Sequence, residues 1–436
     1  MSLTSKLTTI AAAGSGGDTA LFILSLYGAN NLYINDITTD SSGDIIAGGS
    51  SGYSTGSALN VKVGPNGNII FSDLTGKSLY DNFKGVSVDS SGNIYSVGTI
   101  YDGASQGYIR KVSSDNTLLW EKRIYKTGRQ VVLNDCDIQT TNESRLLIGG
   151  HSTGSATALA FYYGQVNTSD GTGLLDQYEQ WTYSQSCYSV CAGDVSIYNL
   201  VHYGGIAGVT SPAGQQHDFL KVQRNSIISA YGETFPFAGQ SNSSIQDIAI
   251  SGTDAYLAVS GNRAWFIKAA SLGFGAKTVK IFNSVSYAKG VAVDSSGNAY
   301  FLAYTTGVGT SNAHIFKYDS SFNLVWSRLL KASNTTRYVT PNRIAISADG
   351  LNIYVCGREN AQTDGVYSGF IFKCPTDGSL TGTYGNFVYA TSATPASASA
   401  GAAKTNASTL ANGPFLTDTP TTATASFTPT SVLKKG

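Results

Sequence analysis

Short apolar runs, broken by turn sequences rich in Asp, Ser, Gly and Asn, recur along most of the chain. In the clearest copy, runs at 86–88 and 93–97 flank the sequence Asp89-Ser-Ser-Gly92, and two more runs follow at 108–112 and 118–124. β-branched and aromatic residues suit a pleated surface, whereas Asp and Gly close tight turns with little strain. The pattern therefore predicts four antiparallel strands in each copy.

Seven copies of this unit can be laid over one another. Their first hairpins span residues 37–49, 86–98, 138–150, 189–206, 248–261, 291–300 and 344–357. Lys recurs in the third strand, at Lys62, Lys111, Lys221, Lys268, Lys317 and Lys373, and Trp120, Trp181 and Trp326 mark the fourth. A four-stranded unit with a period of about 50 residues is typical of a propeller blade. We therefore expect an all-β fold, a seven-bladed β-propeller of four-stranded antiparallel blades with an extended C-terminal arm.

The chain divides into three parts. Residues 1–20 are an N-terminal lead segment, residues 21–390 form the propeller, and residues 391–436 are a low-complexity arm of Ala, Ser, Thr and Pro. The apolar run at 21–27 resembles a fourth strand, so we expect it to pair with the last blade, at about 340–390, and to close the ring. The alternative is a stray apolar segment. The arm cannot bury a core of its own, and we expect it to order against other subunits, with Phe415 and Phe427 as anchors.

Charge and cysteine content exclude several classes of function. Only 13% of the residues are charged, the formal net charge is zero and no basic run is present, which argues against nucleic-acid binding. No apolar run is long enough for membrane insertion, and the N-terminus lacks the continuous apolar stretch of a secretory signal peptide. The five cysteines are an odd number and the four histidines are scattered, so we expect no disulfide framework, no metal and no cofactor. Whether Cys187 and Cys191 pair stays open, since they could do so only across a turn.

Four residues that precede predicted first strands form a candidate ligand site at one mouth of the central channel. They are Asp36, Asp137, Asp247 and Arg343. Three carboxylates and a guanidinium there could hold a cation or a sugar. The alternative, which we favour, is that each Asp accepts hydrogen bonds from its own loop. No nucleophile elbow, P-loop or zinc-protease motif is present, so we expect no catalytic residues and no enzymatic activity.

The copies resemble a known group of β-propeller repeats. The core Asp-x-x-Gly-Asn-x-Tyr-x-x-Gly, at residues 89–98, is similar to repeats of bacterial and bacteriophage proteins, including virion structural proteins of tailed marine phages. The resemblance implies a non-enzymatic virion protein of the tail or capsid, made in the host cytoplasm, whose propeller is a rigid platform for assembly or host contact. Its implied partners are other virion proteins, in homo- or hetero-oligomers, and a host surface glycan. The alternative is a carbohydrate-binding or polysaccharide-lyase-like propeller acting at the channel mouth.

Overall fold

The structure is a computed structural model of the chain. It describes residues 4–10, 21–27, 31–52, 56–75, 81–125, 129–139, 143–153, 159–179, 186–195, 198–207, 217–224, 227–235, 244–261, 263–270, 277–282, 286–307, 310–360, 367–392, 416–417, 422–424 and 431–434.

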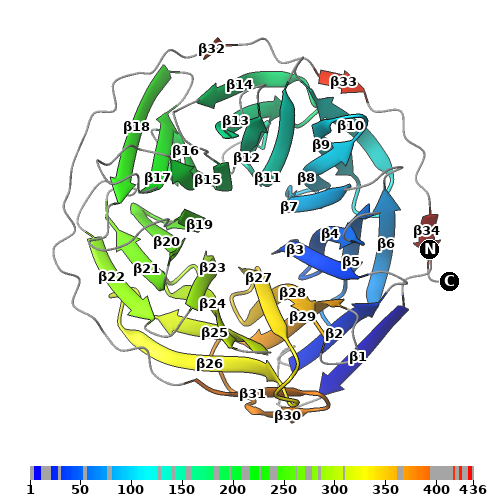
Figure 1. Cartoon of the computed structure of the whole chain (residues 1–436), viewed down its shortest axis with the longest axis vertical. Coiled ribbons are helices and arrows are strands. Elements are labelled where there is room, and N and C mark those ends of the chain that lie inside the picture. The colour runs from blue at the N-terminus through cyan, green and yellow to red at the C-terminus, as the bar shows by residue number, and fades with distance from the viewer. Residues whose placement is uncertain are drawn as a thin grey trace.

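Antiparallel sheets stand side by side around a central channel, and each sheet takes the name of its innermost strand (Figure 1). The β3 sheet contains β3 (Leu32–Thr39), β4 (Ile45–Ser51), β5 (Ser57–Val63) and β6 (Ile69–Thr75). The β7 sheet contains β7 (Asn82–Val88), β8 (Ile94–Tyr101), β9 (Ser105–Val112) and β10 (Leu118–Ile124). The β11 sheet contains β11 (Gln130–Ile138), β12 (Arg145–Thr153), β13 (Leu159–Asn167) and β14 (Gly173–Glu179).

The second half of the ring follows the same order. The β15 sheet contains β15 (Ser186–Val195), β16 (Tyr198–Ala207), β17 (His217–Arg224) and β18 (Ile227–Phe235). The β19 sheet contains β19 (Ser244–Ser251), β20 (Asp254–Ser260), β21 (Ala264–Ala269) and β22 (Lys277–Phe282). The β23 sheet contains β23 (Ser286–Val293), β24 (Ala299–Gly307), β25 (Thr310–Tyr318) and β26 (Leu324–Ala332). The β27 sheet contains β27 (Val339–Ile346), β28 (Asn352–Glu359), β29 (Ser368–Pro375) and, from the other end of the chain, β2 (Leu21–Tyr27).

The predicted closure by residues 21–27 is confirmed. Strand β2 pairs antiparallel with β29, from Phe22 opposite Lys373 to Leu26 opposite Gly369. Its apolar side chains are fully buried between the β3, β23 and β27 sheets, because a strand in the middle of a sheet packs on both faces. The two ends of the propeller are therefore joined within one sheet.

The prediction of seven four-stranded blades is wrong. The structure supports six blades rather than seven. Among the described residues, the sheets around the channel contain four to six strands, and only the β15 and β19 sheets have the expected four. Segments outside the repeats cause the difference, because they add strands to outer edges whose hydrogen-bonding groups would otherwise face solvent.

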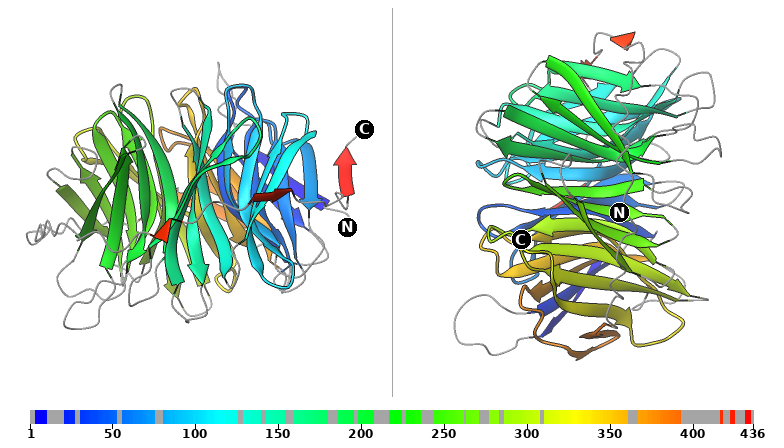
Figure 2. Two further views of the ribbon diagram at one scale, coloured as in Figure 1. Left: turned by 90° about the horizontal axis from the view of Figure 1, so that it is seen from above. Right: turned by 90° about the vertical axis from the view of Figure 1, so that its left-hand side faces the viewer.

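These added strands come from both ends of the chain. Strand β1 (Thr4–Ile10) pairs with the outer side of β2, and β31 (Phe387–Thr391) pairs with β26 and carries β30 (Gly382–Tyr384) on its own outer side. The C-terminal segment adds β32 (Leu416–Thr417) to β14, β33 (Thr422–Thr424) to β10 and β34 (Ser431–Lys434) to β6. Figures 1 and 2 show β32, β33 and β34 on the outside of the ring.

The recurring Asp-Ser-Ser-Gly sequence is a structural turn, as predicted. In the turn after β7, Asp89 Oδ1 accepts hydrogen bonds from the main-chain N–H groups of Ser91 and Asn93, at 3.0 and 2.8 Å. Gly92 has a φ of +78°, which a residue with a side chain rarely adopts. The Asp and the Gly thus each serve the backbone of the hairpin.

The recurring Lys of the third strand contacts the next sheet in four copies, at Lys111, Lys268, Lys317 and Lys373. Lys62 instead pairs with Asp40 and Asp44 of its own sheet. Lys111 donates a hydrogen bond to the Thr168 carbonyl of the β11 sheet, and Lys317 donates to the Thr376 carbonyl of the β27 sheet. Trp120 Nε1 donates to that same Thr168 carbonyl at 3.0 Å. At Lys111, Lys317 and Trp120, the repeated residue thus connects neighbouring sheets.

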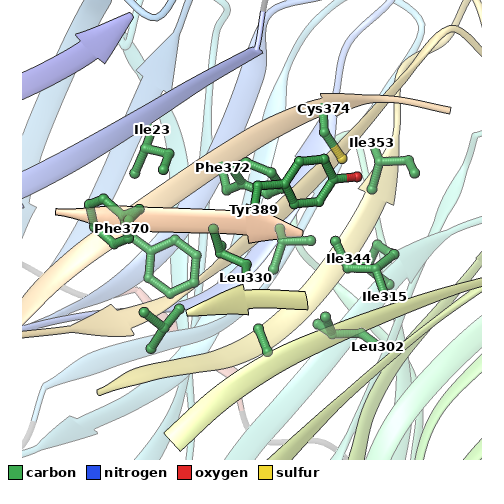
Figure 3. Close-up of a cluster of buried hydrophobic side chains, with 14 of the residues drawn as sticks. Ile23, Leu302, Ile315, Leu330, Ile344, Ile353, Phe370, Phe372, Cys374 and Tyr389 are labelled. Carbon is green, nitrogen blue, oxygen red and sulfur yellow. The ribbon is translucent and has the colours of Figure 1, made fainter. Parts of the chain in front are cut away.

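The hydrophobic core lies between the sheets, in one cluster after another around the ring. Figure 3 shows the cluster between the β23 and β27 sheets, where Phe370 and Phe372 meet Ile315 and Leu330. Tyr389 of β31 is fully buried in it. Because each cluster needs side chains from two sheets, no sheet can bury its apolar surface alone.

Candidate functional site

Each innermost strand carries a one-residue register shift, a β-bulge, at the same point along the channel. The residues directly after the bulges are, in ring order, Asp36, Gly85, Asp135, Ser189, Asp247, Gly290 and Arg343. A bulge bends its strand and re-aims the next side chain. One residue from every sheet is thereby brought to the same level of the channel.

Three of these residues are carboxylates grouped around one guanidinium. Arg343 lies 2.8 Å from Asp247 and 3.2 Å from Asp135 between the nearest nitrogen and oxygen atoms. Its Nε lies 3.6 Å from Asp36 Oδ1. Three of the four predicted site residues, Asp36, Asp247 and Arg343, are thus in direct contact.

The third carboxylate in contact with Arg343 is Asp135, whereas the predicted Asp137 lines the same cavity as the cluster. The β11–β12 hairpin is longer than the β3–β4 hairpin: Asp36 lies opposite Gly48, whereas Asp135 lies opposite Gly149. Aligning the copies on their turns therefore shifted the position by two residues. A short sequence pattern across the bulge would have identified Asp135. It consists of an apolar residue, then Asn or Gln, then Asp, as in Leu133-Asn-Asp135 and Ile245-Gln-Asp247.

Every carboxylate of the cluster also accepts a main-chain hydrogen bond from the neighbouring sheet. Asp36 accepts a hydrogen bond from the main-chain N–H of Val86 at 2.7 Å, Asp135 from Val190 at 3.0 Å and Asp247 from Val291 at 2.9 Å. The residue before each of these valines is small, namely Gly85, Ser189 or Gly290. The post-bulge positions thus form three pairs of an Asp with a small residue on the next sheet.

Arg343 occupies the one post-bulge position outside these pairs. Besides its ion pairs, its guanidinium donates hydrogen bonds to the main-chain carbonyls of Gln246, at 2.9 Å, and Tyr188, at 3.2 Å. These partners lie on the β19 and β15 sheets, so the side chain reaches across the channel from the β27 sheet. Arg343 therefore connects four sheets besides its own and narrows the channel at this level.

Burial governs the protonation of the cluster. It raises the pKa of Asp36 to about 6 and that of Asp135 to about 7, although the positive charge of Arg343 acts in the opposite direction. Burial acts to lower the pKa of Arg343, but the charges of Asp247, Asp135 and Asp36 raise it above its ordinary value. Between about pH 6 and 7, Asp36 and Asp135 are thus partly protonated, which brings the charge of the cluster closer to zero.

A cavity of about 300 Å³ lies beside the cluster, on the side of the Asp-Gly turns. Asp36, Asp135, Asp247 and Arg343 line it, and Asp137 and Thr38 line its next level. Asp137 Oδ1 accepts a hydrogen bond from the N–H of Ile138, in agreement with the local role that we favoured for these residues. The carboxylates around Arg343 combine that role with links between sheets.

Within the described residues, no group of three or more His, Cys, Asp or Glu side chains is arranged to hold a metal ion. Cys187 and Cys191 are both free thiols, and burial raises the pKa of each well above its usual range.

The described part of the chain contains no helix that is long and apolar enough to cross a membrane. Phe415 and Phe427, the predicted arm anchors, lie outside the described residues.

Replacing Gly85 by Ala is expected to destabilise the ring by about 1–3 kcal/mol, because an added methyl group would meet main-chain atoms. A Cβ at Gly85 would lie 2.7 Å from Asp135 Cα and 2.8 Å from Cys136 N. The matched control is Gly290→Ala, whose Cβ would lie 3.0 Å from a side-chain methyl of Ile344. Thermal melts of both variants should place Gly85→Ala clearly lower; equal melting temperatures would contradict the proposed close approach.

The sheets and their closure define a β-propeller protein. Comparison with models of protein families and with the sequences of curated proteins gave no match. Among solved structures, the chain is similar to the β-propeller domain of the Trilobed protease from Pyrococcus furiosus, with 9% identity, a TM-score of 0.40 and coverage of 78% of this chain and 98% of that one. It is also similar to quinohemoprotein alcohol dehydrogenase from Comamonas testosteroni, with 10% identity, a TM-score of 0.39 and coverage of 80% and 77%.

These likenesses are too distant to carry an argument about function. The assignment to the propeller fold rests on the order and closure of the chain's own sheets. Nothing in either comparison supports the predicted bacteriophage origin.

Proposed function

We propose that this protein is a non-enzymatic structural protein whose propeller is a rigid platform for assembly or host contact, and that it belongs to the tail or capsid of a tailed bacteriophage virion. The observation that carries the platform role is the pairing of the C-terminal strands with the outer edges of three successive sheets. In the virion, other subunits of the same or a different kind are the partners of these edges. The resemblance of the repeat core to propellers of phage proteins supports the virion assignment.

The outer edges of the propeller accept added strands. β34 pairs with β6 over four residues, from Ser431 opposite Leu74 to Lys434 opposite Phe71. β33 pairs with β10 over three residues, including Ala423 opposite Arg123. Strand addition uses main-chain hydrogen bonds, so a segment of another subunit could take the same edge. Because the arm strands are short, such an exchange would break few hydrogen bonds.

The alternative of a polysaccharide lyase at the channel has less support. A general base must reach the proton that it removes, and it needs a pKa near the working pH. Asp135 has such a pKa, of about 7, but its carboxylate is held by Arg343 and by the N–H of Val190. Carbohydrate binding without catalysis, the other form of this alternative, would use a different surface of the propeller.

Deleting residues 393–436 is expected to leave folding of the isolated propeller nearly unchanged and to abolish incorporation into particles. The deletion keeps Ser392, which is buried and whose hydroxyl is 3.0 Å from His314 Nδ1. Of the described residues, it removes β32, β33 and β34, which are short strands on the outer edges. Melting temperature and the amount of protein in purified particles are the two measurements.

A point variant gives a sharper form of the same test. Ala423→Pro removes a main-chain N–H and restricts the backbone within β33, whereas Ala423→Ser keeps both. Only the proline variant should lower incorporation. If the deleted protein enters particles normally, the assembly role of the arm is wrong; if the full chain is absent from particles, the virion assignment is wrong.

A further inference from the structure

Five tyrosines gather on the ring face opposite the Asp-Gly turns. They are Tyr33, Tyr287, Tyr304, Tyr338 and Tyr367, here called the tyrosine face, and they come from the adjacent β23, β27 and β3 sheets. They lie near the start of an innermost strand, the end of a second strand or the start of a third, positions that share one face of an antiparallel blade.

The rings of the tyrosine face contact one another in two groups. Tyr33 and Tyr367 stack with ring centroids 6.4 Å apart, and Tyr338 lies 6.3 Å from Tyr367. Tyr287 and Tyr304 stack at 5.2 Å. Tyr287 is 36% exposed and the other four rings are partly exposed, so the surface remains open to a ligand.

Two cations lie among these rings. The Arg358 guanidinium is 5.5 Å from the ring centroid of Tyr33 and 5.1 Å from that of Tyr367, and Lys289 Nζ is 5.5 Å from that of Tyr304. In the described part of the chain, neither cation forms an ion pair with a carboxylate or donates a side-chain hydrogen bond. Arg343 differs, because it contacts three carboxylates.

The two cations share one positive environment. Burial, together with the positive charges of Arg343 and Arg358, lowers the pKa of Lys289 to about 8. Burial raises the pKa of Tyr304, and the charge of Arg358 acts to lower it. A bound anion would offset the repulsion between these cations.

Main-chain contacts hold the tyrosine face in place. Asn31 Oδ1 accepts a hydrogen bond from the N–H of Tyr367 at 3.0 Å, and the Tyr367 carbonyl accepts one from the N–H of Leu32 at 2.9 Å. The N–H of Tyr338 donates to Asn360 Oδ1 at 2.6 Å. Because these hydrogen bonds fix the main chain at Tyr338 and Tyr367, ligand binding would cost little ordering entropy there.

We propose that the tyrosine face, with Arg358 and Lys289, binds an acidic saccharide through a sugar unit that bears a carboxylate. Tyrosine rings present flat apolar faces to the C–H groups of a sugar and hydroxyls to its polar edge. The planar guanidinium of Arg358 matches a carboxylate in two parallel hydrogen bonds, and Lys289 adds a point charge. This inference deepens the host-contact role by naming a ligand class. It rests on the proposed function only in assigning the saccharide to a host surface.

The test uses the purified full chain and three probes: a galacturonic acid oligomer, a neutral galactose oligomer of equal length and a sulfated galactose oligomer. Titration calorimetry should show binding to the galacturonic acid oligomer at least about tenfold tighter than to the neutral one. Equal affinity for the acidic and neutral oligomers, or no binding of the acidic one, would overturn the proposal. Tighter binding of the sulfated oligomer would overturn the assignment to a carboxylate.

Arg358→Met should lower affinity for the galacturonic acid oligomer by about tenfold or more, because it removes the paired hydrogen bonds. The matched control is Lys280→Met, which removes a cation from the outer strand β22. If Arg358→Met does not fold, as judged by its melt, Lys289→Met serves as the second variant. Unchanged affinity in the folded variant refutes the site. Particle incorporation plays no part in this measurement, so the virion assignment can fail independently.

Discussion

Deletion of residues 1–30 is expected to abolish cooperative folding of the propeller. Strand β2 supplies five fully buried apolar side chains, Leu21, Phe22, Ile23, Leu24 and Leu26, to the clusters on both faces of its sheet. Burial of five such side chains is worth about 10 kcal/mol in total. A typical domain is stable by only about 5–15 kcal/mol, so the loss is comparable with the whole free energy of unfolding.

The measurement is a thermal melt followed by size-exclusion chromatography. Without β2, the edge of β29 is open and should drive aggregation, because its main-chain groups lose their partners. The control is deletion of residues 1–12, which removes β1 and leaves β2 in place. That variant should remain monodisperse and melt cooperatively. If both deletions melt like the full chain, the closure of the ring by β2 does not contribute to stability.

Replacing Arg343 by Met is expected to destabilise the protein by about 3–5 kcal/mol, because buried carboxylates then lose their cation. Asp36, Asp135 and Asp247 would face one another across the channel with only main-chain and hydroxyl donors remaining. Thermal or denaturant unfolding measures the change. Adding Asp247→Asn to the variant should recover part of the loss, since it removes the carboxylate closest to Arg343. A melting temperature within about 2 °C of the wild type would contradict this role.

The same cluster predicts a pH dependence with a definite sign. The pKa values of Asp36 and Asp135 in the folded protein, about 6 and about 7, lie above the ordinary 3.8, so the folded state binds more protons than the unfolded state between these limits. Their contribution to stability is therefore complete below about pH 3.8 and is lost as pH rises through 6 to 7. The double variant Asp36→Asn, Asp135→Asn should flatten the fall in this window, and an unchanged slope would refute the assignment.

The sequence was informative where the physical cause is local. A turn such as Asp89-Ser-Ser-Gly92 is specified by side-chain hydrogen bonds to neighbouring N–H groups and by a glycine at positive φ, so it could be read from four residues. The apolar run at 21–27 could be matched to the fourth strand at 119–125 because both sequences carry apolar residues at corresponding positions near their two ends. Neither inference required knowledge of a distant partner.

The candidate site could be read only in part. Asp36, Asp247 and Arg343 were found because their hairpins align with the repeat, whereas the longer β11–β12 hairpin displaced Asp135. The tyrosine face was missed altogether. Its members are 17–80 residues apart along the chain within the β23 and β27 sheets, and no local pattern links them to Tyr33.

The sequence by itself determined the all-β repeat, its turns, the closing strand and the absence of familiar catalytic motifs. Tertiary structure decided how many strands each sheet holds, since an edge accepts any segment that reaches it. It also decided which carboxylates meet Arg343 and which rings meet Arg358, because a bulge and the packing of neighbouring sheets set those distances. Hydrogen bonding within a turn is fixed over a few residues, whereas contacts across the channel depend on the closed ring.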